Sequence, residues 1–374
     1  MRLSLLIGAA SLSLVGVVLS AGCEGHGKYT SAFKAEAEAN AAAIHSATEW
    51  DAANQAYHSG NIDRALQHIE LSISLKGDVS RSHLLHAKIL LEDGDSDRAF
   101  GALGTGLALD AGSHELHYYR GILHERMGDF RLATTDYEAA MALEPSQLQY
   151  VIAASETLVS LGDLDGAEAL LKRSNDRFGH AAGLKQALGH IALMRDDLTA
   201  ASSYFSQAKV LDPKSATIDE DLARVLIEQE RFIEARYTLS QLLSRPTHSE
   251  RRDLRLMHAR TLIETDEPVL ARDLLMDITR ENAGAAEITA WRLLIDVALM
   301  LEDDYLLERA SDRLIASTPR EPDGYLARAM WQRRQGKFED AMASADLASR
   351  HASDDDRVRV MREIIAHDLA LAGR

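Results

Sequence analysis

Along most of the chain, apolar residues recur every three to four positions in short segments, and polar turns separate these segments. The stretch from His114 to Gln147 shows the pattern clearly. Its first half carries Tyr119 among its apolar positions, and its second half carries Tyr137. Gly128 lies between them, where a turn needs a permissive backbone, and Pro145 lies where a helix must end. The spacing therefore predicts two short helices joined by a tight turn.

The same pattern recurs at a nearly constant interval. With Gly128 as the turn marker, the markers are 34 residues apart, except for two steps of 36, and stand at Gly60, Gly94, Gly128, Gly162, Asp196, Glu230, Asp266, Glu302 and Gly336. The residue five positions later is alanine in eight of the nine cases, which predicts a close approach of two helices: Ala65, Ala99, Ala133, Ala167, Ala201, Ala235, Ala271, Leu307 and Ala341. Self-similarity at this period is typical of a repeat protein.

The repeat resembles the tetratricopeptide repeat (TPR) family, whose units are 34-residue helix–turn–helix hairpins. Further matches are an early Trp and Leu, a Gly in the first helix and an aromatic residue in the second, namely Trp291, Leu294, Gly121, Gly189, Tyr137 and Phe205. The resemblance covers roughly Ser46 to Asp355. It implies an all-α fold, an α-solenoid in which about nine hairpins at 46–353 form a right-handed superhelix, followed by a capping helix at 354–374.

One hairpin cannot bury its apolar face alone, so stacked neighbours are expected to form a continuous core. The connection at 244–252 is longer than the others and contains Pro246. We predict a mild joint there, with a change in superhelical pitch. The run Asp354 to Asp356 is expected to begin the terminal helix, since acidic side chains favour a helix start.

The start of the chain has the features of an export signal. Arg2 supplies a positive charge, residues 3–19 are mostly apolar, and small residues lead directly to Cys23, the only cysteine. Small residues ending at a cysteine resemble the bacterial lipobox. The resemblance implies a signal peptide at 1–22 and a lipid on Cys23. A plain signal peptide and a retained membrane anchor remain alternatives. Residues 23–45 are expected to form a tether and a lead helix at Ser31 to Ile44.

Composition narrows the class of partner. The chain has 58 acidic and 41 basic residues and a formal charge of −17. This balance argues against nucleic acid as a partner, because nucleic-acid binding depends on Lys and Arg that neutralise phosphate. It favours a basic protein partner, although a solvated acidic surface with no partner accounts for the same charge.

The TPR resemblance also implies which residues line a concave groove. In the first four hairpins the groove positions are aromatic or aliphatic and give the candidate partner site Trp50, Tyr57, Leu84, Leu91, Tyr118, Ile122, Ile152 and Val159. From the fifth hairpin onward the same row turns more polar and includes Arg292 and Arg333. Aromatic anchors in a preformed concave surface are typical of a peptide-binding groove. The alternative is that these residues pack against the lead helix or against neighbouring hairpins.

No motif in the sequence predicts catalysis, and no cofactor or metal site is expected. Fifteen histidines are present, but there is no HExxH helix and no cysteine ligand pair. Neither a glycine-rich phosphate loop nor a GxSxG turn occurs. Four histidines fall where helices of the second and third hairpins pack together, which predicts a structural role: His83, His86, His117 and His124.

These observations predict a non-enzymatic scaffold or adaptor for protein–protein interaction. It would be exported, anchored by lipid to a bacterial envelope membrane, most simply the outer membrane facing the periplasm, and would bind a protein or peptide in its groove. Two alternatives remain open. One is an enzyme, or a regulatory subunit of an envelope enzyme complex of the cell-wall or secretion machinery. The other is a purely structural spacer, since a fold does not by itself imply a function.

Overall fold

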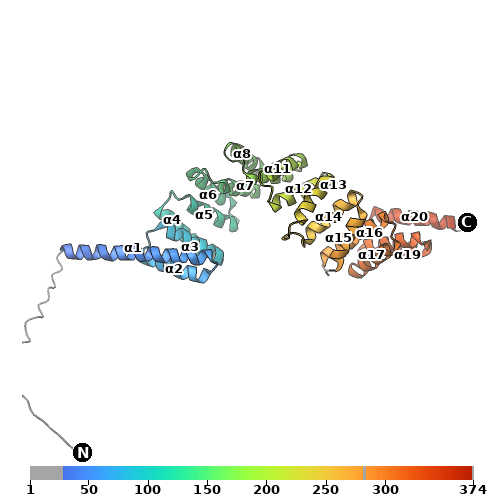
Figure 1. The fold of residues 1–374 in the computed structure, drawn as a ribbon, viewed down its shortest axis with the longest axis horizontal. Coiled ribbons are helices and arrows are strands. Elements are labelled where there is room, and N and C mark those ends of the chain that lie inside the picture. Colours follow the sequence, from blue (N-terminus) through green and yellow to red (C-terminus); the bar gives the residue numbers. More distant parts are fainter. Residues whose placement is uncertain (1–27, 281–283, 373–374) are drawn as a thin grey trace, which may run out of the picture. The chain divides into compact units, whose positions relative to one another are not determined.

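The computed structural model describes residues 28–280 and 284–372, and every regular element within these ranges is a helix (Figure 1). The predicted lipidation site Cys23 and the predicted signal peptide lie outside the described residues. The chain divides into two compact units, one ending at Thr157 and the other beginning at Leu158. The division falls within the helix Leu148–Ser160.

The first unit consists of helical hairpins in sequence order. Its helices are α1 (Lys28–His58), α2 (Ile62–Leu75), α3 (Ser80–Asp93), α4 (Ser96–Leu109), α5 (His114–Arg126), α6 (Phe130–Leu143) and most of α7 (Leu148–Ser160). The predicted lead helix is not a separate element. It runs without a break into the first helix of the first hairpin, because no glycine or proline interrupts residues 28–58 (Figure 1).

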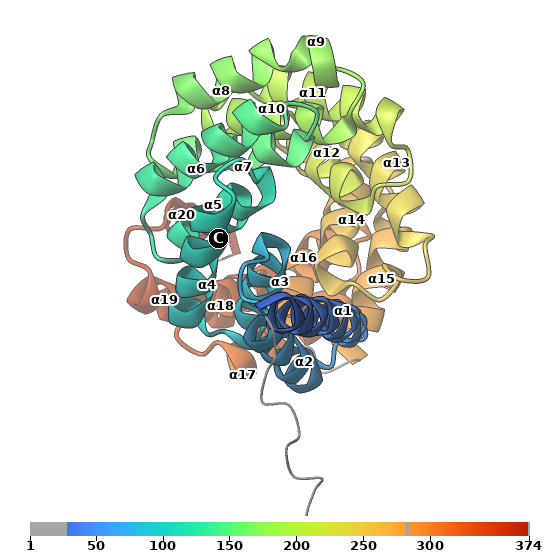
Figure 2. The same ribbon diagram turned by 90° about the vertical axis from the view of Figure 1, so that its left-hand side faces the viewer.

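The second unit continues the same alternation. Its helices are α8 (Leu164–Arg173), the single-turn α9 (Asn175–Phe178), α10 (Ala182–Met194), α11 (Leu198–Leu211), α12 (Ala216–Glu228), α13 (Phe232–Leu243), α14 (Arg252–Glu264), α15 (Pro268–Arg280), α16 (Ala285–Met300), α17 (Asp304–Ser317), α18 (Pro322–Arg334), α19 (Phe338–His351) and α20 (Asp356–Ala372). Within this unit the first helices α12 and α14 follow the inner side of the curve, and the second helices α13 and α15 follow the outer side (Figure 2).

The nine predicted turn markers all adopt a left-handed backbone, with φ between 53° and 85°. In each turn the next residue donates its N–H to a carbonyl five residues earlier, as in Asp129 N to His124 O at 2.8 Å. This is the Schellman ending of a helix, which glycine favours because it has no Cβ. Four turns use Asp196, Glu230, Asp266 or Glu302 instead, at a cost of about 1 kcal/mol each.

The signature position is the point of closest helix packing. All eight alanines and Leu307 are fully buried, at 0% exposure. In the third hairpin Gly121 faces the buried ring of Tyr137, and a Cβ on Gly121 would lie 2.5 Å from Tyr137 Cε1. Gly189 and Phe205 form the same pair in the fifth hairpin, also at 2.5 Å. The predicted repeat architecture, an all-α solenoid of helical hairpins, is therefore confirmed.

The long connection between α13 and α14 is anchored on both sides. Arg245 pairs with the buried Asp219 at 2.6 Å and donates a hydrogen bond to the Lys214 carbonyl at 2.9 Å. Leu242 before the connection and Leu254 after it belong to one apolar cluster. The core thus runs across the site of the predicted joint, and a change of pitch there stays a prediction.

The terminal helix α20 covers the last hairpin. Its buried residues Val358, Met361 and Ile365 share an apolar cluster with Ala345 and Ala348 of α19. This is the packing expected of a capping helix that closes the end of a repeat array.

Candidate functional site

Four tyrosines meet on α5, α6 and α7 in the first unit. The ring centroid of Tyr118 lies 5.4 Å from that of Tyr119, 5.6 Å from Tyr137 and 4.9 Å from Tyr150. Tyr137 and Tyr150 are buried, whereas Tyr118 and Tyr119 are half-exposed. The two buried rings therefore form a floor on which the two accessible rings are held.

Hydrogen bonds hold the floor rigid. Tyr137 donates its hydroxyl hydrogen to Glu125 Oε2 at 2.7 Å, and the Tyr150 hydroxyl lies 2.7 Å from His114 Nδ1. Burial, with the hydrogen bond to Glu125 next in size, raises the pKa of Tyr137 far above its usual value. Both phenols thus stay neutral and satisfied, as buried polar groups must. Aromatic rings fixed in this way offer contact area at a small entropic cost on binding.

Carboxylates surround the accessible rings. Burial raises the pKa of Tyr119, and Glu115 and Glu92 add to that effect. Burial likewise raises the pKa of Tyr118, with contributions from Tyr119 and Glu125. Burial also raises the pKa of Tyr57 on α1, Glu92 and Tyr119 add to that effect, and Lys88 opposes it. Negative charge therefore dominates around these rings.

One lysine lies among these groups, and its charge is already engaged. Lys88 Nζ is 4.7 Å from the centre of the Tyr119 ring and 3.2 Å from Glu115 Oε1. This contact shows that the face of Tyr119 accepts a cation. We call six residues on α1, α3 and α5 the tyrosine surface: Tyr57, Lys88, Glu92, Glu115, Tyr118 and Tyr119.

The predicted groove residues divide into several groups. Tyr57 and Tyr118 belong to the tyrosine surface, and Ile122 and Ile152 are half-buried in the same unit. Val159 is also half-buried but belongs to the second unit. Of these three half-buried aliphatic residues, only Ile122 and Ile152 therefore lie in the unit that carries the tyrosine surface.

Two groove predictions fail because the residues are core residues. Leu84 and Leu91 are only 8% and 7% exposed and pack in the apolar cluster of α3, α4 and α5. Trp50 is half-buried, and its ring already makes contacts within its own chain. The Arg81 guanidinium lies 4.8 Å from the ring centre, and the indole N–H points to the Arg81 carbonyl at 3.5 Å. A position rule taken from sequence does not tell how deep each residue lies.

The lead segment does not fill the groove. Residues 31–40 are all exposed, and α1 makes its buried contacts only from Ser46 onward. The groove aromatics therefore do not pack against this segment, and the segment does not cover the tyrosine surface.

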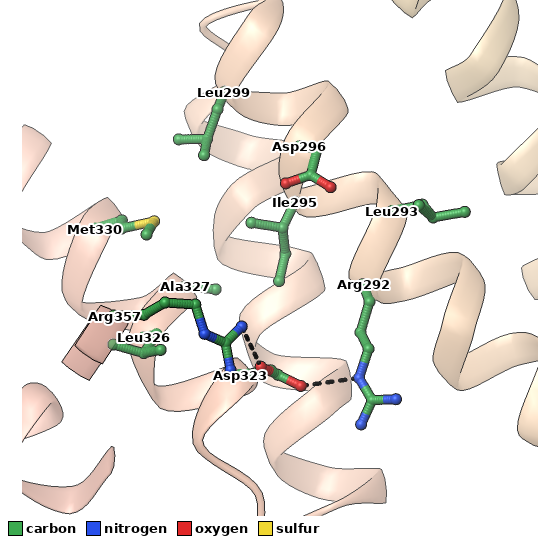
Figure 3. Close-up of a pocket in the computed structure, with 10 residues that line it drawn as sticks. All are labelled: Arg292, Leu293, Ile295, Asp296, Leu299, Asp323, Leu326, Ala327, Met330 and Arg357. Carbon is green, nitrogen blue, oxygen red and sulfur yellow. Dashed lines mark hydrogen bonds and ion pairs between the residues drawn. The ribbon is translucent and has the colours of Figure 1, made fainter. Parts of the chain in front are cut away.

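A second candidate site lies in the second unit, on the first helices α16 and α18 and on α20. A pocket of about 310 Å³ is lined there by Arg292, Leu293, Ile295, Asp296, Leu299, Asp323, Leu326, Ala327, Met330 and Arg357 (Figure 3). Asp323 lies between two arginines. Its carboxylate is 2.9 Å from Arg292 Nε and 3.0 Å from the Arg357 guanidinium (Figure 3). Leu299, Leu326 and Met330 form the apolar wall.

The pocket also contains Asp296, and the two arginines do not neutralise its carboxylate. Arg292 also pairs with Glu321, and Arg357 also pairs with Asp355 at 2.7 Å. Asp296 has no ion-pair partner among the described residues. Burial raises its pKa, and Glu264 raises it further. An apolar side chain with a cationic end would complement this pocket. The sequence pattern placed Arg292 in the groove row but gave no sign that a pocket forms there.

The histidines singled out in the sequence lie in packed positions. His83 and His124 are buried, and His83 Nε2 lies 2.8 Å from the Gly77 carbonyl. Burial lowers the pKa of His86, helped by Arg98. Within residues 28–280 and 284–372, no group of three or more His, Cys, Asp or Glu side chains is arranged to hold a metal ion.

No protein-family model matches the chain, and no curated protein matches it in sequence. Among solved structures, PilW, described as a widely conserved type IV pilus biogenesis factor, is 18% identical; the match covers 55% of this chain and 95% of PilW, with a TM-score of 0.49. The PilF protein of Pseudomonas aeruginosa is 16% identical over 56% of this chain and 94% of its own, with a TM-score of 0.46. A thermophilic TPR protein of Thermus thermophilus is 21% identical over 50% of this chain and 100% of its own, with a TM-score of 0.40.

Proposed function

We propose that the protein is a non-enzymatic scaffold or adaptor that binds a protein or peptide segment on the first-helix face of its hairpins. The tyrosine surface carries this proposal. It offers accessible aromatic rings on a buried and hydrogen-bonded floor, in a setting of carboxylates. Tyrosine and tryptophan dominate the binding energy of protein interfaces, and a rigid platform lowers the cost of binding.

The chemistry of the surface favours a segment that combines apolar and basic residues. Apolar side chains can stack on Tyr118 and Tyr119, while Lys or Arg can pair with Glu92 and Glu115 or lie over a ring, as Lys88 does. The pocket of the second unit has the same preference, since Asp296 lies beside the apolar wall of Leu299. Two sites of like chemistry suit a partner that offers several such side chains.

The test is a cross-linked affinity capture from the native envelope, followed by a binding titration with the recovered partner. Changing Tyr118→Ala and Tyr119→Ala together should weaken binding by about 30-fold or more, the usual loss at an aromatic hot spot. The matched control is Leu109→Ala with Leu132→Ala, two exposed apolar residues on the second helices of the same unit, and it should bind normally. Unchanged affinity in a folded tyrosine variant would refute the proposal. Circular dichroism must show unchanged helix content in both variants.

We further propose that the scaffold is held on the bacterial envelope by a lipid on Cys23. Two facts support this: the chain has one cysteine, and it follows small residues at the end of an apolar run. Within the described part of the chain, no helix has the length and apolar character needed to cross a bilayer.

Cys23→Ser should abolish incorporation of labelled fatty acid and release the protein from the membrane fraction. A Ser20→Ala variant, which keeps a small residue before the cysteine, should stay lipidated. If the Cys23→Ser protein remained in the membrane fraction without label, the anchor would be something other than a lipid on this residue.

A further inference from the structure

Three consecutive hairpins of the second unit expose an apolar residue where the other hairpins have a polar one. The position lies three residues after the turn marker. It is apolar and exposed in the sixth to eighth hairpins, at Ile233 (70%), Val269 (49%) and Tyr305 (73%). In the first to fifth and ninth hairpins the same position holds Asp63, Asp97, Arg131, Asp165, Thr199 and Glu339. Single exposed apolar residues are ordinary, but a row at one repeat position forms a surface.

More exposed apolar side chains extend this row. Tyr237 on α13 is 65% exposed, and Leu270 on α15 is 55% exposed. Both lie on second helices, which follow the outer side of the curve in this unit (Figure 2). The pocket on α16, α18 and α20 is lined by none of these residues, so the row is a different surface from the one proposed above.

The same three hairpins also carry acidic residues in their turns. Glu230, Asp266 and Glu302 adopt φ of 59°, 59° and 53°; Asp196 of the fifth hairpin does the same at 57°, and the other five turns have glycine. All three side chains are exposed, and none has an ion-pair partner among the described residues. Glutamate is disfavoured in this left-handed conformation, because its Cβ lies too close to the following carbonyl oxygen. Strain retained at a particular site points to a function of the side chain there.

Apolar and acidic side chains lie close together where the sixth hairpin meets the seventh. The start of α13 borders the turn between α14 and α15, where Arg236 reaches Thr265 Oγ1 at 3.1 Å and Glu267 at 3.3 Å. A concavity of about 460 Å³ there is lined by Ile233 and Phe232, by the four carboxylates of Glu230, Glu234, Glu264 and Glu267, and by the two arginines Arg231 and Arg236, which pair with Glu234 and Glu267. We call the three turns and the residues that follow them the outer strip: Glu230, Ile233, Tyr237, Asp266, Val269, Leu270, Glu302 and Tyr305.

We propose that the outer strip is a second docking surface and that its occupant is a basic amphipathic segment of a partner protein. Apolar residues of that segment would cover Ile233, Val269 and Tyr305, and its Lys or Arg side chains would pair with the turn carboxylates. A second copy of this chain is a poor fit, because the chain carries a charge of −17 and would bring like charges together. An anionic membrane surface is disfavoured for the same reason.

The experiment uses the full chain carrying Tyr118→Ala and Tyr119→Ala, so that the tyrosine surface does not bind the probe, and a fluorescent 18-residue helical peptide with lysine on one face and leucine on the other. Fluorescence anisotropy measures its affinity, and amide hydrogen exchange locates it. Bound peptide should protect the starts of α13, α15 and α17. The triple variant Ile233→Ser, Val269→Ser and Tyr305→Ser should bind at least about tenfold more weakly. The same changes at the equivalent polar positions, Asp63→Ser, Asp97→Ser and Arg131→Ser, should leave the affinity unchanged.

A second variant separates binding from folding. Changing Glu230→Gly, Asp266→Gly and Glu302→Gly should relieve strain and raise Tm by about 3 °C or more, while it weakens peptide binding at least about tenfold. Lower affinity in a more stable protein cannot come from unfolding. The proposal is overturned if protection appears only on α3 and α5, if a glutamate–leucine peptide binds equally well, if the strip binds anionic vesicles instead, or if the strip variants convert a dimer into a monomer.

Discussion

Replacing Asp136 by alanine is expected to lower the free energy of unfolding of the first unit by about 3 kcal/mol. Asp136 lies on α6 and is only 3% exposed. Its carboxylate receives hydrogen bonds from Arg120 at 2.5, 2.9 and 3.1 Å and lies 3.3 Å from His117 Nδ1. His124 Nε2 lies at 3.7 Å from the same carboxylate. Removing it leaves a partly exposed guanidinium and two more deeply buried imidazoles without their shared acceptor.

The effect should be measured by urea unfolding followed by circular dichroism, with amide hydrogen exchange on α5 and α6. Exchange is needed because hairpins interact mainly with their neighbours, so the loss can be local. The matched control is Asp312→Ala, which removes a pair with Arg328 in which the aspartate side chain is 59% exposed. It should change stability by less than about 0.5 kcal/mol. A loss below about 1 kcal/mol for Asp136→Ala would mean that solvent or another acceptor replaces the carboxylate.

Gly121→Val is expected to cost about 3 kcal/mol or more, because it overpacks the third hairpin. A Cβ at Gly121 would lie 2.5 Å from Tyr137 Cε1 and 2.7 Å from Tyr137 Cδ1. The ring cannot move away easily, since it is fully buried and its hydroxyl is bonded to Glu125. The tyrosine surface depends on that ring, so partner binding should fall together with stability.

The control for Gly121→Val is the same change at Gly101 on α4. A Cβ there meets no atom within 4 Å, and valine has a better helix propensity than glycine. Thermal unfolding should therefore show little change or a small gain for Gly101→Val. Gly189→Val should reproduce the large loss in the second unit, because its Cβ would lie 2.5 Å from Phe205 Cε1. Equal behaviour of Gly121→Val and Gly101→Val would show that the third hairpin can open to accept the added atoms.

The features that were predicted correctly depend on local chemistry repeated along the chain. A left-handed turn selects glycine, and a close helix approach selects alanine, so nine instances in phase located both the turns and the buried signature positions. The pairs of Gly121 with Tyr137 and of Gly189 with Phe205 were likewise visible as matched positions in two helices. The helix α20 was foreseen because the acidic run from Asp354 to Asp356 marks its start.

The features that were missed depend on depth and on contacts between elements. Leu84 follows the same position rule as Tyr118, yet a leucine at that place sinks into the core while a longer tyrosine reaches the surface. Tyr119 lies next to Tyr118 in sequence, but its contact with Lys88 comes from another hairpin. Nothing in the spacing shows that Arg292 and Arg357 share Asp323 across three helices. The continuity of α1 was also missed, although no helix-breaking residue lies between its two halves.

That continuity has a mechanical consequence. At a rise of 1.5 Å per residue, the 31 residues of α1 form a rod about 46 Å long, and sharp bends in helices occur mainly at proline or glycine, which α1 lacks. Its second half is built into the first hairpin, while residues 31–40 are all exposed. A force or torque applied at Lys28 is therefore transmitted to the first hairpin, because α1 contains no hinge that would absorb it.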